Sequence, residues 1–202
     1  MRFVLPGELL AEAAHMDVEN AYVEDGKTYS NIFGIYYEEK KKVQQMEGPF
    51  MPHKGDEIIG VVTDVRHNNC IIDINSPYRG TLFVRGRGSD LQSGQVVLAK
   101  VSFVDEIRNV ELEDAKVLNG GEIIEIPASK VPRVLGKAAS MLSMIKEMTH
   151  CEIIVGVNGR IWINGGDSSL AVYAILKIER EAHISGLTDR IKQFLTDEVA
   201  KR

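Results

Sequence analysis

The feature that most constrains the fold is a series of five short apolar runs between residues 53 and 116. They cover Ile58 to Arg66, Cys70 to Ile74, Gly80 to Val84, Gln95 to Val104 and Asn109 to Leu112. Turn residues separate the runs, and none of the runs has the apolar spacing of a helix. Short strands rich in valine and isoleucine at this spacing are typical of a small closed β-barrel.

Residues 117–202 change period and predict an α/β domain. Three strand-like runs stand at Glu122 to Ile126, Glu152 to Val155 and Ile161 to Ile163. Between the first two, apolar residues recur at helical spacing around Gly136, namely Leu135, Ala138, Leu142 and Ile145. Asn158-Gly159 joins the last two strands as a hairpin turn. With a further helix after the third strand, the predicted order is β-α-α-β-β-α.

The end of this region predicts two helices. Asp167 is a suitable N-cap for the first, and Ser185-Gly186 would end it. Its apolar stripe comprises Ala171, Ala174, Ile175, Ile178 and Ala182. The second helix, capped by Thr188, would pack Ile191, Leu195 and Val199 onto a partner or back onto the domain.

Residues 1–52 predict a small β domain. The Asp25-Gly26 pair between two strand-like runs indicates a tight hairpin, because both central residues of such a turn need a positive φ. Gly48, Pro49 and Pro52 indicate an extended linker. The fold class is therefore multidomain, β-rich plus α/β, with domains at 1–52, 53–116 and 117–202.

The net charge of −5 speaks against a protein that coats nucleic acid indiscriminately. Any RNA contact must therefore come from local basic patches. No apolar run reaches the roughly 18 residues that a membrane-spanning helix needs, and Cys70 and Cys151 stand far apart without a metal-ligand spacing. A reduced, cytoplasmic protein that does not enter a membrane is the simplest interpretation.

The sequence offers no constellation that would carry catalysis. Its five histidines are scattered, and it contains no Walker loop, no G-x-S-x-G and no H-E-x-x-H. With two distant cysteines it cannot build a four-cysteine zinc site. We therefore expect a protein without enzymatic activity, cofactor or bound metal.

The most basic stretch runs from Arg79 to Gly88. It holds Arg79, Arg85 and Arg87 without an acidic residue, and Phe83 stands among them. Guanidinium groups bind phosphates and an aromatic ring stacks on a base, so this segment on a barrel face would suit single-stranded RNA. The alternative is a mobile loop in which Phe83 is buried.

A second candidate RNA site surrounds Gly136. A glycine between two helices lets the backbone approach a phosphate, and Lys137 and the N-terminus of the second helix would add positive potential. A lone glycine is a weak signal, and its value comes from the β-α-α-β-β-α setting.

Both modules resemble known RNA-binding domains. Residues 53–116 resemble the S1-type OB domain, with Lys54-Gly55-Asp56, Ile59-Gly60-Val61-Val62 and the strand from Gln95 to Val101. Residues 117–202 resemble a KH domain. In this order, and behind Val4 and Pro6-Gly7-Glu8, the modules resemble the archaeal exosome's RNA-binding cap subunit of the KH-containing kind. The segments Ile74 to Tyr78 and Gly156 to Gly159 strengthen this match.

The resemblance implies a non-catalytic subunit of an RNA-degrading complex. Three copies would sit on a hexameric ring of phosphorolytic ribonuclease subunits, with residues 1–52 docking on the ring. They would gather the 3′ ends of single-stranded RNA for 3′-to-5′ degradation, and phosphorolysis would belong to the ring.

The RNA-binding set that this implies combines basic, aromatic and loop residues of both modules. In the barrel it comprises Arg66, His67, Arg79, Phe83, Arg85, Arg87 and Arg108. In the KH domain it comprises Lys130, Arg133, Gly136, Lys137, Asn158, Gly159 and Arg160. The chain departs from the family patterns at Ala139, where a KH loop has its second glycine, and at Phe83, where S1-type domains often have histidine. Arg108 stands one position from the usual basic site.

Two other interpretations are open. A fragment of polynucleotide phosphorylase would carry the same modules, but in that enzyme the KH domain precedes the S1-type domain. A translational or ribosome-associated RNA-binding factor could carry them without any ring partner.

Overall fold

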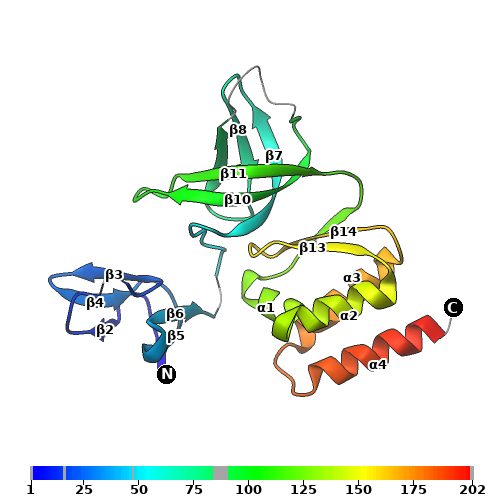
Figure 1. Ribbon diagram of the computed structural model, residues 1–202. Coiled ribbons are helices and arrows are strands. Elements are labelled where there is room, and N and C mark those ends of the chain that lie inside the picture. The colour runs from blue at the N-terminus through cyan, green and yellow to red at the C-terminus, as the bar shows by residue number, and fades with distance from the viewer. Residues whose placement is uncertain (1, 16, 47, 84–90, 201–202) are drawn as a thin grey trace. The chain divides into compact units, whose positions relative to one another are not determined.

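The computed structural model describes residues 2–15, 17–46, 48–83 and 91–200 (Figure 1). The chain divides into two compact units, Met1–Gly48 and Pro49–Arg202. The division falls at the Gly48-Pro49 pair that marks the linker in the sequence. Arg85 and Arg87, two of the predicted RNA-binding residues, lie outside the described residues.

The first unit consists of two three-stranded antiparallel sheets. One has the order β1 (Arg2–Val4), β5 (Gly34–Tyr37), β6 (Lys42–Gln45), and the other has the order β2 (Leu9–Ala11), β4 (Lys27–Ser30), β3 (Ala21–Glu24). A short 3-10 helix, η1 (Glu38–Lys40), joins β5 to β6. The predicted hairpin is confirmed: Asp25 and Gly26 have φ values of 48° and 74°, so both central residues of the turn are left-handed.

The second unit begins with a closed five-stranded barrel. Its strands are β7 (Glu57–Val65), β8 (Asn69–Asp73), β9 (Arg79–Phe83), β10 (Val96–Val104) and β11 (Val110–Leu118). They follow the order β10-β11-β9-β8-β7, and β7 closes the barrel against β10. The pair β9–β11 is parallel and the others are antiparallel. This is the predicted OB-type barrel, although β11 continues past residue 116.

Two glycines allow the barrel strands to approach one another closely. A Cβ atom on Gly60 would lie 2.2 Å from Cγ2 of Ile72, and one on Gly80 would lie 2.5 Å from Cδ1 of Leu112. Both contacts are with buried side chains of the barrel core. A larger residue at either position would therefore clash with these core side chains.

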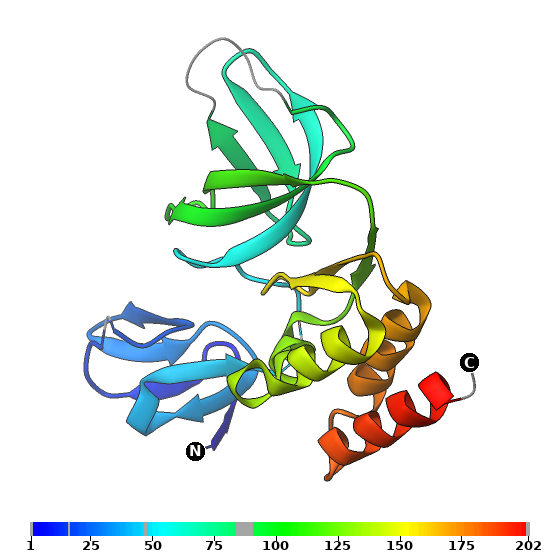
Figure 2. The same cartoon turned by 45° about the vertical axis from the view of Figure 1, so that its right-hand side comes forward.

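The KH domain follows the barrel within the same unit. Its sheet has the antiparallel order β12 (Glu122–Glu125), β14 (Arg160–Asn164), β13 (Glu152–Val155). Its helices are η2 (Ala128–Lys130), α1 (Val131–Leu135), η3 (Lys137–Ala139), α2 (Ser140–Thr149), α3 (Ser168–Glu181) and α4 (Leu187–Ala200). The α-helices lie on one side of the sheet (Figures 1 and 2). The predicted β-α-α-β-β-α order is confirmed.

The α3 helix matches its prediction closely. The carboxylate of Asp167 accepts a hydrogen bond of 3.1 Å from the backbone N–H of Leu170, as an N-cap does. The predicted apolar stripe from Ala171 to Ala182 is buried. Ala171, Ala174, Ile175 and Ile178 of this stripe join the core of the domain together with residues of its sheet and of its other helices.

Three details of the helices differ from the sequence prediction. The α3 helix ends at Glu181, before the predicted end at Ser185-Gly186. The first predicted helical stripe includes Ala138, but Ala138 and Ala139 have φ values of 51° and 59°, so α2 begins only at Ser140. Thr188 does not cap α4, because the helix already begins at Leu187 and the carbonyl of Gly186 accepts the first bond from the N–H of Arg190.

The α4 helix packs on its own domain. Ile191 and Leu195 are fully buried in the KH core, whereas Val199 is 46% exposed. The prediction that this helix packs back onto its own domain is therefore correct for its first turns. Among the described residues, no helix has the length and the apolar content needed to cross a membrane.

Candidate nucleic-acid interface

Phe83 lies on the outer surface of the barrel. Gly80, earlier in β9, faces Leu112 in the barrel core, and the strand's alternation then turns Phe83 outward. The Phe83 side chain is 57% exposed. The alternative interpretation, in which Phe83 is buried, is therefore wrong, and the ring is free to stack on a base. Arg79, at the start of the same strand, is also exposed.

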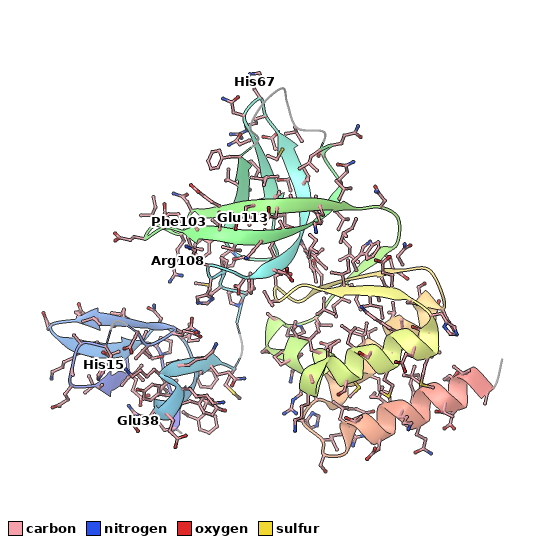
Figure 3. All side chains as sticks on the ribbon, in the orientation of Figure 1. His15, Glu38, His67, Phe103, Arg108 and Glu113 are labelled. Carbon is pink, nitrogen blue, oxygen red and sulfur yellow. The ribbon has the colours of Figure 1, made fainter. Side chains whose placement is uncertain are left out.

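The predicted RNA-binding residues of the barrel lie in two groups, one at each end of β9. Asn69 pairs with Phe83, so the β7–β8 turn that carries Arg66 and His67 lies at the Phe83 end of β9. Val110 pairs with Gly80, so the β10–β11 turn that carries Arg108 lies at the Arg79 end. Figure 3 shows His67 and Arg108 on separate parts of the barrel.

The two turns differ in the interactions that surround their arginines. Arg66 Nε lies 2.8 Å from Asp64 Oδ2, and both side chains are exposed, so this pair is weak and open to competition from a phosphate. Arg108 has a φ of 65° within a turn that Asp105 fixes. The Asp105 carboxylate accepts hydrogen bonds of 2.6 Å from the backbone N–H and from Nδ2 of Asn109.

The loop between α1 and α2 presents cations beside a glycine. A Cβ atom on Gly136 would lie 2.7 Å from Cβ of Met141, so close packing against α2 requires glycine here. Gly136 also has a φ of 72°, which favours glycine. Arg133 and Lys137 are exposed and Lys130 is half-buried. These side chains can therefore reach a phosphate that approaches the loop.

Asn158 is fully buried where the KH domain meets the barrel. Its Oδ1 accepts a hydrogen bond of 3.3 Å from the N–H of Ile59, and its Nδ2 donates bonds of 2.8 Å to the carbonyl of Ile59 and 2.9 Å to that of Ile74. The regular pairing of β7 with β8 ends at Val61 and Asp73. The side-chain amide of Asn158 thus continues the ladder, pairing with Ile59 as a neighbouring strand would.

The rest of the β13–β14 turn supports this contact. The N–H of Val157 donates a 2.9 Å hydrogen bond to the carbonyl of Glu57 on β7. Gly159 has a φ of 85°, and a Cβ atom there would lie 2.1 Å from the carbonyl oxygen of Ile126. The hairpin is a three-residue loop rather than the two-residue turn predicted from Asn158-Gly159, because Gly156 N–H bonds to the carbonyl of Arg160.

Arg160 also joins the two modules. Its side chain is 7% exposed; Nε bonds to Glu125 Oε1 at 2.8 Å, and Nη1 donates to the carbonyl of Asp73 at 2.7 Å. Nη2 pairs with the Asp73 carboxylate. Asn158, Gly159 and Arg160 therefore make hydrogen bonds within the protein, and their RNA contact stays a prediction.

Comparison with known proteins places the chain in a family. A family model of the KH domain matches residues 121–169. Exosome complex component Rrp4 of Pyrococcus furiosus is 39% identical over 215 residues, covering 95% of this chain and 81% of that protein. The protein of the same name from Methanosarcina acetivorans is 41% identical, covering 98% of this chain and 82% of that protein. The chain belongs to the Rrp4 family of exosome complex components.

A solved structure agrees with the Rrp4 assignment. A crystal structure described as an exosome complex RNA-binding protein matches with a TM-score of 0.67 and 38% identity, over 74% of this chain and 96% of that chain. The KH-matched residues run from the start of the KH sheet to the first residues of α3. The resemblance to the KH-containing exosome subunit is therefore confirmed as membership of the Rrp4 family.

The sequence interpretation of this Rrp4-family chain missed two features of the interface. Phe103 on β10 is 51% exposed, although strand alternation alone would place it inside. Asn75 Nδ2 donates a 3.1 Å hydrogen bond to the carbonyl of Asn158. The sequence did contain a signal for the Asn75 contact, because Asn75 lies in the Ile74–Tyr78 segment that resembles the family.

Replacing Asn158 by alanine tests the contact between the modules. Three main-chain groups would lose their partner at a buried site, so we expect Asn158→Ala to lower the free energy of unfolding by at least about 2 kcal/mol. Asn158→Asp should be at least as harmful, because a carboxylate would face the carbonyls of Ile59 and Ile74. Fluorescence of Trp162, the chain's one tryptophan, during denaturation provides the measurement.

Asn75→Gly serves as the matched control, because Asn75 has a φ of 55° that glycine adopts without strain. It removes one partly exposed hydrogen bond to the same turn and should cost no more than about 1.5 kcal/mol. Equal midpoints for wild type and Asn158→Ala would show that the amide does not stabilise the unit.

Proposed function

We propose that this chain is a non-catalytic RNA-binding subunit of an exosome. It would hold the 3′ end of single-stranded RNA in the cytoplasm. Three copies of the chain would cap a hexameric ring of phosphorolytic ribonuclease subunits, and the ring would cleave the RNA. Membership of the Rrp4 family carries this proposal, since the relatives are named as exosome components. The order of an OB-type barrel followed by a KH domain supports it.

The exposed cations and aromatic rings of the second unit would bind the RNA. Phe83 offers a stacking surface, and Arg66 and His67 stand at the same end of β9. In the sequence Arg85 and Arg87 stand two and four residues after Phe83. Stacking and phosphate contacts of this kind bind flexible single strands with little dependence on sequence. Arg133 and Lys137 would extend the contact along the KH domain.

The first unit would dock on the ring through an apolar sheet surface. On β1, Phe3 is 66% exposed and pairs with Ile35 of β5. Leu5 is 60% exposed and Met46, directly after β6, is 39% exposed. Exposed apolar side chains gathered on one sheet are typical of a protein-binding surface. A ring subunit with a complementary apolar patch is the partner that we propose.

Charge reversal tests the RNA contact. We expect Arg85→Glu combined with Arg87→Glu to weaken binding of an unstructured oligoribonucleotide at least tenfold. Losing two phosphate contacts should flatten the slope of log affinity against log salt by about 1.4. Fluorescence anisotropy at several salt concentrations measures both. The purified chain should leave the RNA intact, with or without inorganic phosphate.

Lys40→Glu combined with Lys192→Glu provides a matched control. It changes the net charge equally at two exposed positions outside the barrel and leaves the ion pair of Lys41 with Asp17 intact. An equal loss of RNA affinity in both double variants would mean that RNA binding depends only on the net charge of the chain. Turnover of RNA by the isolated wild type would contradict the non-catalytic role.

Serine substitutions test the docking surface. Phe3→Ser combined with Leu5→Ser should abolish co-elution with purified ring subunits on gel filtration, because central apolar anchors dominate such contacts. RNA affinity of the isolated chain should not change. Deleting residues 1–48 should have the same effect and leave the second unit folded.

Tyr22→Ser is the control for this experiment, because Tyr22 is 37% exposed on the other sheet of the same unit. It should retain co-elution. If the Phe3/Leu5 variant also co-eluted with the ring subunits, the surface would not be the docking site. Recovery of ribosomes in place of ring subunits from native extract would favour a ribosome-associated factor.

A further inference from the structure

Phe103 is turned outward by an irregularity in β10. Val97, Ala99 and Val101 face the barrel core at alternating positions, so a regular strand would bury Phe103 as well. The pairing of β10 with β11 shifts between Val101 and Phe103. Beyond the shift, Phe103 pairs with Glu111 and is 51% exposed. β-Bulges often re-aim a side chain next to a functional site.

Phe103 and Phe83 lie on the same outer face of the barrel. Glu111 is paired with Phe103 on β10 and with Thr81 on β9. Phe83 follows Thr81 by two residues, so it projects from the same side of the sheet. From two strand spacings and two residues along a strand, the Cα atoms of the two phenylalanines stand about 12 Å apart. A few nucleotides of an extended strand can span this separation.

The charges around this face suit bases in the middle and phosphates at the rim. Glu111 lies between the two phenylalanines, and Glu113 is on the same strand. Carboxylates repel phosphates but accept hydrogen bonds from base amino groups. Arg79 and Arg108 lie toward the end of the face where β11 begins. Figure 3 shows Phe103 and Arg108 at the same end of the β10–β11 hairpin.

We propose that Phe103 is a second base-stacking platform of the barrel, which binds a base of the same RNA strand that stacks on Phe83. The proposal rests on the RNA-binding function proposed above and extends it to a residue outside the predicted set. Two exposed rings on one face, with carboxylates between them and guanidinium groups at the edge, fit a single strand whose bases face the protein.

Anisotropy measurements on two matched oligoribonucleotides test the proposal. One is unstructured and carries all its bases, and the other has the same backbone with abasic sites. Phe103→Ala should bind the first about 5- to 150-fold more weakly than wild type, the effect of losing one stacked base. Its salt dependence should equal that of wild type, because no phosphate contact is lost. The abasic strand should bind both proteins equally.

Two further variants sharpen the result. Phe103→Trp should bind RNA at least as tightly as wild type, since its larger ring also stacks on a base. Ile107→Ala, at an 80% exposed position of the same hairpin, should bind RNA as wild type does. An unchanged thermal midpoint for Phe103→Ala would show that it folds.

The outcomes separate the two proposals. If wild type binds RNA and Phe103→Ala binds equally well, the platform is refuted and the RNA-binding function stands. If wild type itself binds no RNA, both fail. If Phe103→Ala keeps its RNA affinity but loses the ring subunits, Phe103 is a protein contact and the platform is refuted.

Discussion

The side-chain amide of Asn158 is the interaction on which the second unit depends. It pairs with both main-chain groups of Ile59 and with the carbonyl of Ile74, at the point where β8 stops covering β7. An amide can do this because it carries a donor and an acceptor side by side. Leaving such groups buried without partners would be costly, so the barrel and the KH domain fit together only with this turn in place.

This contact has a consequence for RNA binding. The β13–β14 turn is held against the barrel, because the N–H of Val157 bonds to the carbonyl of Glu57 and Asn158 bonds to Ile59 and Ile74. Arg160, with Asp73 and Glu125, adds a buried guanidinium to the same contact. Of the cations predicted to bind RNA in the KH domain, Lys130, Arg133 and Lys137 remain accessible around Gly136. Hydrogen bonds and an ion pair thus join the two modules within the second unit.

The sequence predicted the parts of the fold that local chemistry determines. The left-handed pair at Asp25 and Gly26, the cap at Asp167 and the buried stripe of α3 follow from residue type and spacing. The five barrel strands follow from their period.

The role of Asn158 could not be predicted, because its partners on β7 and β8 are distant in sequence and the turn pattern also fits an exposed hairpin. Phe103 was missed for a related reason. Its outward direction comes from a shift in pairing with β11, which the alternation of β10 alone does not reveal.

The most direct test of this account is the measurement of residual dipolar couplings for backbone amides of the barrel, residues 57–118, and of the KH domain, residues 122–200. Two modules joined rigidly by Asn158 must share one alignment tensor, and the account predicts that a single tensor fits both sets of couplings. Two tensors that differ in magnitude or orientation would show that the modules move independently, and would contradict the account.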